Sequence, residues 1–169
     1  MKLYDVFTKR RSIRSFTDEP VSKETLNKLA NAVHLAPSAC NRQPYKFIAV
    51  TSPELKAQLC EVVSQSFIKE APVIIIGLVD TAAAWVRAKD NKSMADTDLA
   101  IAMEHLVLAA TAENLGTCWV ASFDAAAVNK ILGIEGTWTS QVLTPVGYSN
   151  EGEKEFFRTK NISDIFEVR

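Results

Sequence analysis

Residues 71–80, APVIIIGLVD, restrict the fold more than any other part of the sequence. Nearly every residue in this stretch is apolar and several are β-branched, a composition typical of a strand buried on both faces. The apolar run from Val73 to Val79 is far too short to cross a bilayer. We therefore expect the central strand of a sheet that is covered on both sides.

The flanking sequence predicts that helices and strands alternate around this strand within one domain, residues 1–169, of the α+β or α/β class. Leu3, Val6 and Phe7 follow helical spacing. The other predicted helices run from Ser22 to before Pro37, from Pro53 onward, from 96 to 115 with Gly116 ending the helix, and from Asp124 to Leu132. The other predicted strands are 46–50, 117–123 and 139–148, and we expect residues 81–95 to be loop with some helix.

Cysteine content and charge exclude several classes of protein. Cys40, Cys60 and Cys118 show neither a disulfide framework nor zinc-ligand spacing, so we expect no metal site. The first residues have no apolar signal region, which favours a cytoplasmic protein with no membrane contact. The formal net charge of −1 argues against a protein built to bind nucleic acid.

Positive charge is nevertheless concentrated in KRRSIRSFTDEP, residues 9–20. Three interpretations are open: a solvated patch at a helix end, a nucleic-acid arm, or a phosphate site. The first 76 residues contain no glycine, so no early glycine-rich turn can bind phosphate through backbone N–H groups. A phosphate site would have to use side chains, and the planar fork of arginine suits phosphate oxygens.

A second polar stretch, APSACNRQPYKF, spans residues 36–47. Its prolines fit an ordinary loop between a helix and a strand. The concentration of amide and hydroxyl groups in one rigid loop also fits recognition of the edge of a heteroaromatic ring.

Taken together, these stretches resemble the nitroreductase family of flavoenzymes. RRSIRSF stands about twenty residues ahead of APSACNRQPYKF, and HLVLAATAENLGTCWVASFD and GYSNEGEKEFFRTK follow in the family's order. The resemblance covers nearly the whole chain. It implies a three-layer α/β/α domain with a mixed, mostly antiparallel sheet flanked by helices, and an intertwined homodimer that holds FMN at its interface.

The resemblance also implies which residues bind FMN. Arg10, Arg11, Ser12 and Arg14 match the phosphate and ribityl motif, and Arg158, with Lys160, matches a C-terminal basic residue that returns to the phosphate. The ring-contacting loop of the other subunit corresponds to Pro37, Ser38, Ala39, Asn41 and Gln43. Backbone N–H groups of Ala121 and Ser122 fall where the family approaches flavin N5.

The implied chemistry belongs to the cofactor, and no residue of the chain is expected to act as a catalytic group. NADH or NADPH would deliver hydride to flavin N5, and a nitroaromatic, quinone or similar small-molecule acceptor would then be reduced in a ping-pong cycle. Arg14 would stabilise negative charge on the reduced ring. The alternatives are a specialised member that remodels flavin or removes halogens, and a flavin-binding module without turnover.

Overall fold

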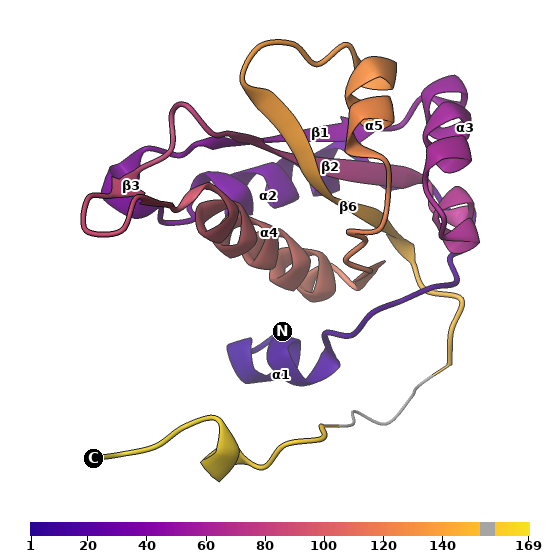
Figure 1. Cartoon of the computed structure of the whole chain (residues 1–169). Coiled ribbons are helices and arrows are strands. Elements are labelled where there is room, and N and C mark those ends of the chain that lie inside the picture. Colours follow the sequence, from indigo (N-terminus) through magenta and orange to yellow (C-terminus); the bar gives the residue numbers. More distant parts are fainter. Residues whose placement is uncertain (153–157) are drawn as a thin grey trace.

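The computed structural model spans residues 1–169 and describes 1–152 and 158–169 (Figure 1). Four strands form one sheet in the order β1-β2-β6-β5, and every neighbouring pair is antiparallel. These strands are β1 (Tyr45–Val50), β2 (Val73–Asp80), β5 (Leu115–Thr117) and β6 (Trp138–Tyr148). A parallel bridge between Ser12 and Thr117 adds the segment after the first helix to this sheet.

The described residues form five α-helices: α1 (Leu3–Lys9), α2 (Lys23–His34), α3 (Pro53–Val62), α4 (Ala95–Ala112) and α5 (Ala125–Leu132). Helices α2 to α5 cover the sheet, and α1 packs against α4. Local capping sets where three of them begin. Ser22, Ser52 and Asp124 each accept a hydrogen bond from the backbone N–H three residues later, at the starts of α2, α3 and α5. Short 3-10 turns lie at Ala39–Asn41, Ser66–Glu70 and Ile162–Asp164.

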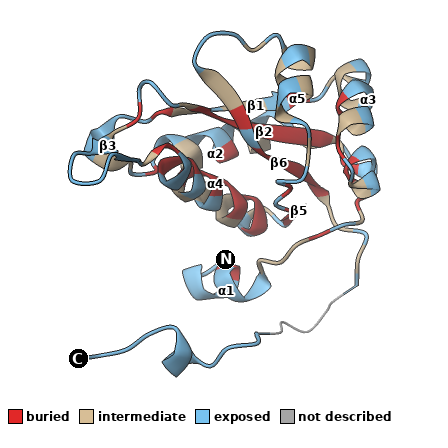
Figure 2. Cartoon of the chain, in the orientation of Figure 1, coloured by how far each residue is buried: buried red, intermediate tan, exposed pale blue. Residues whose placement is uncertain are grey.

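The central strand β2 is covered on both faces, as its sequence predicts. Ile74 and Ile76 pack with residues of α3 and α5, whereas Val73 and Ile75 pack with residues of α2 and α4. Figure 1 shows these two helix pairs on opposite sides of the sheet, and Figure 2 shows β2 and the inner face of α4 as the buried centre. The three-layer α/β/α fold is confirmed.

Three local predictions were wrong. Gly116 does not end α4; it lies within β5, paired with Gly147, and the left-handed residue after the helix is Asn114 (φ 62°). Of the strand predicted at 117–123, only Thr117 lies in a strand, as the last residue of β5, because the chain then leaves the sheet and returns at the bridge from Val120 to Leu143. Residues 81–95 hold a small hairpin of β3 (Val86–Arg87) and β4 (Lys92–Ser93), and the only helical residue there is Ala95, the first of α4.

The two ends of the chain are much more exposed than the core (Figure 2). Helix α1 buries only Val6, and residues 158–169 are exposed throughout, including Ile162, Ile165 and Phe166. Among the described residues, no helix combines the length and apolar character that crossing a membrane requires.

Candidate functional site

The basic segment, residues 10–16, begins where α1 ends. The backbone N–H of Arg10 closes the helix on the Val6 carbonyl (2.9 Å), and Ile13 N–H donates to the Thr117 carbonyl (2.9 Å). Ile13 and Phe16 are buried, Ser12 is half-buried and Arg14 is exposed. Arg11 lines the same small cavity as Ile13 and donates from its guanidinium to the Gly152 carbonyl (3.0 Å). The Arg11 guanidinium thus has a partner within the chain, whereas the Arg14 side chain faces solvent.

The basic segment is fixed by its backbone. Gly116 allows this, because a Cβ at that position would stand 2.8 Å from the Cβ of Ile13. Farther along, Arg14 N–H donates to the Glu151 carboxylate (2.5 Å), and Thr17 N–H donates to the Tyr148 carbonyl (2.9 Å). Neither Gly116 nor Glu151 was among the site residues expected from the sequence.

The polar loop, residues 36–44, connects α2 to β1 and is strained. Cys40, Asn41 and Gln43 have φ values of 51°, 55° and 49°, in the left-handed region that residues other than glycine seldom adopt. Each such residue costs about 1 kcal/mol or more, and strain of this kind persists only where the surroundings enforce it. The loop therefore has a conformation that the rest of the fold must hold in place.

Hydrogen bonds within the loop provide part of that hold. Ser38 Oγ accepts the Gln43 N–H (2.9 Å), and the Gln43 side-chain amide donates to Asn41 Oδ1 (2.9 Å). Asn41 and Gln43 are exposed, so their amides are presented to the outside while each orients the other. Pro37 is exposed, and Ser38 and Ala39 are half-buried.

Three further side chains supply the rest: Asp98 and Tyr45 from outside the loop and Arg42 from within it. Asp98 Oδ1 on α4 accepts the Ala39 N–H (2.9 Å), and the Tyr45 hydroxyl donates to the Ala36 carbonyl (3.2 Å). Arg42 donates to the carbonyl of Ala84 (3.1 Å), ahead of the β3–β4 hairpin. Burial, with a smaller contribution from nearby Asp98, raises the pKa of the Tyr45 phenol, so the group stays a donor. Spacing in the sequence gave no signal for these anchors.

The basic segment and the polar loop lie at opposite ends of the sheet. Tyr45 pairs with Val79, which pairs with Thr139 near the start of β6, whereas Ser12 bridges Thr117, which pairs with Val146 near its end. Seven strand residues at about 3.3 Å each separate these levels by roughly 23 Å. Figure 1 shows the loop before β1 beside β3, and the segment after α1 running along the far end of β6. One copy of the chain does not bring them together.

Ala121 and Ser122 occupy a level between these two ends. They follow Val120, which bridges Leu143 in the middle of β6, and both are exposed. Arg158 and Lys160 are also exposed and lie in the C-terminal tail. Part of the GYSNEGEKEFFRTK motif, residues 153–157, lies outside the described residues.

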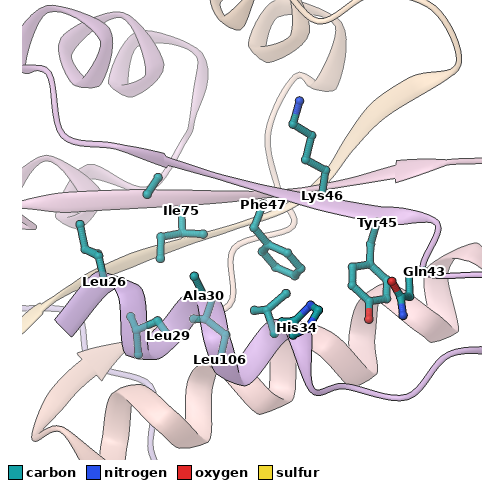
Figure 3. A pocket seen from close by; sticks show the side chains of 12 residues that line it. Leu26, Leu29, Ala30, His34, Gln43, Tyr45, Lys46, Phe47, Ile75 and Leu106 are labelled. Carbon is teal, nitrogen blue, oxygen red and sulfur yellow. The ribbon is translucent and has the colours of Figure 1, made fainter. Parts of the chain in front are cut away.

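A groove of about 360 Å³ between α2 and β1 was not expected from the sequence (Figure 3). Its floor is apolar, with Leu29, Phe47 and Ile75 among the lining side chains, and His34 and Gln43 lie at one end. The groove runs along β1, which is an edge strand of the sheet. Within the described parts of the chain, no cluster of three or more His, Cys, Asp or Glu side chains could hold a metal ion.

Comparison with known proteins identifies the family of this chain. A model of the nitroreductase family matches residues 7–72 and 60–148. The chain belongs to the nitroreductase family. A putative NAD(P)H nitroreductase of Streptococcus pyogenes is 27% identical over the full length of both chains.

Other relatives agree on fold and class. A nitroreductase family protein from Clostridium difficile superimposes with a TM-score of 0.91 at 26% identity, covering 99% of this chain and 98% of its own. An FMN reductase [NAD(P)H] of Bacillus subtilis is 39% identical over 84 residues, which are 49% of this chain and 34% of that protein. This nitroreductase-family chain is an oxidoreductase, as the family and these relatives indicate.

Proposed function

We propose that this chain is an FMN-dependent oxidoreductase that takes hydride from NADH or NADPH and passes it to a nitroaromatic, quinone or similar electron-poor acceptor. The observation that carries the proposal is the basic segment, which is anchored to β5 by its backbone and carries half-buried Ser12 and exposed Arg14. Its half-buried neighbour Arg10 provides a second guanidinium. Two guanidinium groups and a hydroxyl are suitable donors for a phosphomonoester.

The polar loop suits the other part of the cofactor. Asn41 and Gln43 present amide groups in a fixed orientation, and such groups can pair with the donors and acceptors at the edge of the isoalloxazine ring. FMN, when bound, supplies the hydride chemistry at its N5 atom. The residues of the chain bind and orient it: Arg10, Ser12 and Arg158 at the phosphate, with Arg11 and Lys160 nearby, Arg14 toward the pyrimidine edge, and the backbone at Ala121 and Ser122 near N5.

The separation of the two regions supports a homodimer. A distance of roughly 23 Å along β6 exceeds what a single mononucleotide spans, so the loop, with Pro37, Ser38 and Ala39, would serve an FMN held by the basic segment of a second copy. Two symmetric sites would form, because an isologous interface repeats every contact.

The exposed tail offers a second argument for the same assembly. Ile162, Ile165 and Phe166 are 79%, 70% and 71% exposed, an unusual concentration of bare apolar side chains. The groove between α2 and β1 is apolar and borders a strand edge whose backbone groups can pair with an added segment. We place the tail of the second copy in this groove.

Purified full-length protein tests the function directly. We expect it to bind one FMN per chain, and the bound flavin to lose its visible absorbance when NADH or NADPH is added without oxygen. A protein that takes up no FMN contradicts the proposal. Flavin that binds but stays oxidised with both nucleotides would favour a flavin-binding module, and DNA binding that survives saturation with FMN would favour a nucleic-acid role.

Acceptor assays then separate the activities within the family. Oxidation of the reduced enzyme by nitroaromatics or quinones supports the proposal, whereas turnover restricted to halogenated aromatics or to free flavin would assign a specialised activity. Sedimentation tests the assembly: the protein should be a dimer, and Phe166→Glu should shift it toward monomer, because a buried carboxylate is costly.

A further inference from the structure

Among the described residues, Asp98 is a buried carboxylate whose role the proposed function leaves open. Asp98 lies near the start of α4 and is 2% exposed. Its Oδ1 atom accepts the N–H of Ala39, 2.9 Å away. Its Oδ2 atom is buried and has no hydrogen-bond partner among the described residues.

A carboxylate at this buried position carries a high desolvation free energy. Burying a charged group with one oxygen unpaired costs far more than burying an apolar side chain of similar size. The amide dipoles at the start of α4 favour a negative charge there and offset part of this cost. These dipoles do not explain why a hydrogen-bond acceptor lies at this point. The hydrogen bond from Ala39 N–H does explain it.

Ala39 is the residue from which the strained part of the loop starts. The Ser38 carbonyl accepts from Asn41 N–H (3.0 Å), and the Ala39 carbonyl accepts from Arg42 N–H (3.2 Å). The orientation of the peptide between Ser38 and Ala39 therefore sets the direction of the turn that follows. Cys40 and Asn41, in the left-handed region, come directly after it.

We propose that Asp98 is a positioning residue that holds the polar loop in its strained conformation through the N–H of Ala39. The inference rests on the proposed function in one respect, because the loop it positions is the one assigned to the FMN ring. Asp98 itself is enclosed by protein and touches neither cofactor nor acceptor in this assignment.

Amide hydrogen exchange on flavin-free protein tests the positioning without depending on flavin. In Asp98→Ala, exchange at Ala39, Asn41 and Gln43 should become at least tenfold faster than in the unmodified chain. Asp98→Asn keeps an acceptor oxygen of the same reach, so exchange should stay within threefold. Thr111→Val is the matched control, because Thr111 is a buried polar residue on the same helix whose hydroxyl donates within α4, to the Val107 carbonyl.

A change on the other side of the bond gives an independent readout. Ala39 occupies the first position of a 3-10 turn, where proline fits the backbone, and Ser38 has the extended conformation that precedes proline well. Ala39→Pro therefore removes the N–H and keeps the local backbone angles, while its ring displaces the Asp98 carboxylate from the position it occupies 2.9 Å from the nitrogen. Asp98→Ala removes that carboxylate, so the double variant relieves the clash. Ala39→Pro should reproduce the faster exchange at Asn41 and Gln43, and the double variant with Asp98→Ala should be no worse than either single one.

FMN titration completes the test. The dissociation constant should rise at least tenfold in Asp98→Ala and in Ala39→Pro, and stay within threefold in Asp98→Asn and Thr111→Val. Three results would overturn the proposal. Amide exchange could stay unchanged in both Asp98→Ala and Ala39→Pro, or Thr111→Val could raise exchange and the dissociation constant as much as they do. The third is a double variant whose loss of FMN affinity equals the sum of the two single losses. If exchange behaves as expected but the unmodified chain binds no FMN, the proposed function fails while the positioning by Asp98 stands.

Discussion

The basic segment and the polar loop are held in place in opposite ways. The segment is fixed by its backbone, through the Ile13 bond to Thr117 and the close approach to Gly116, and it leaves the Arg14 side chain exposed. The loop is fixed by side chains, Asp98 and Tyr45 among them, and it has a strained backbone.

The difference matches the two ends of the proposed ligand. A phosphate is a charge with little shape, so long cationic side chains on a firm backbone can reach it, and salt should weaken the interaction. A ring edge is a pattern of donors and acceptors that is recognised only if the amides are held at fixed angles. Charge should therefore decide how tightly the basic segment binds FMN, and the geometry of the amides should decide how tightly the polar loop binds it.

Removing charge from the phosphate end should have the largest effect. Arg10→Ala combined with Arg158→Ala should weaken FMN binding about 100-fold or more, since hydrogen bonds to charged groups contribute about 1.5–3 kcal/mol each. The residual binding should also depend less on salt, as measured by titration at two ionic strengths. Lys9→Ala, the exposed neighbour, serves as the control and should bind normally. Stoichiometric FMN in the double variant would show that the phosphate lies elsewhere.

The second-largest effect should come from disturbing the backbone contact between Gly116 and the basic segment. Gly116→Ala places a methyl group 2.8 Å from Ile13, so we expect a loss of about 1–3 kcal/mol in the free energy of unfolding, together with weaker FMN binding. Gly152→Ala is the matched control, because a Cβ there meets nothing within 4 Å. Urea denaturation of both variants measures the free energy of unfolding. A Gly116→Ala variant as stable as the unmodified chain would contradict the close approach of Gly116 to Ile13.

A change at Cys40 separates loop geometry from thiol chemistry. At φ 51°, a β-branched side chain is poorly tolerated, so Cys40→Val should lower the free energy of unfolding by about 1–2 kcal/mol. Cys40→Gly should be close to neutral and bind FMN normally, because glycine adopts this φ readily. Thermal melting and FMN titration compare the two. Loss of FMN in the glycine variant would point to a role for the thiol.

The smallest effect should come from Tyr45→Phe, with a loss of about 1 kcal/mol for one neutral hydrogen bond. The raised pKa of Tyr45 means that the unfolded chain ionises first as the pH rises. This contribution is fully present below about pH 10, the ordinary tyrosine range, and declines above it. The stability difference between Tyr45→Phe and the unmodified chain should therefore shrink at alkaline pH, and a constant difference would contradict the burial of the phenol.

Much of the architecture could be predicted because it depends on local patterns. The apolar stretch 71–80 indicated a doubly covered strand, and Ser22, Pro53 and Asp124 marked helix starts close to where the structure has them. The same local reasoning failed at Gly116. A glycine after a helix usually serves the turn, but here it permits the contact with Ile13, which is about a hundred residues away in the chain.

The amino-acid sequence by itself determined most of the helices and strands, the coverage of β2 on both faces, the family motifs and the chemical character of both polar stretches, because these follow from side-chain type and spacing. Only the tertiary structure placed the basic segment and the polar loop at opposite ends of β6, and only it showed that Asp98 supports Ala39. Such contacts join residues far apart in the chain, and no periodicity in the sequence encodes which distant partner a buried carboxylate will meet.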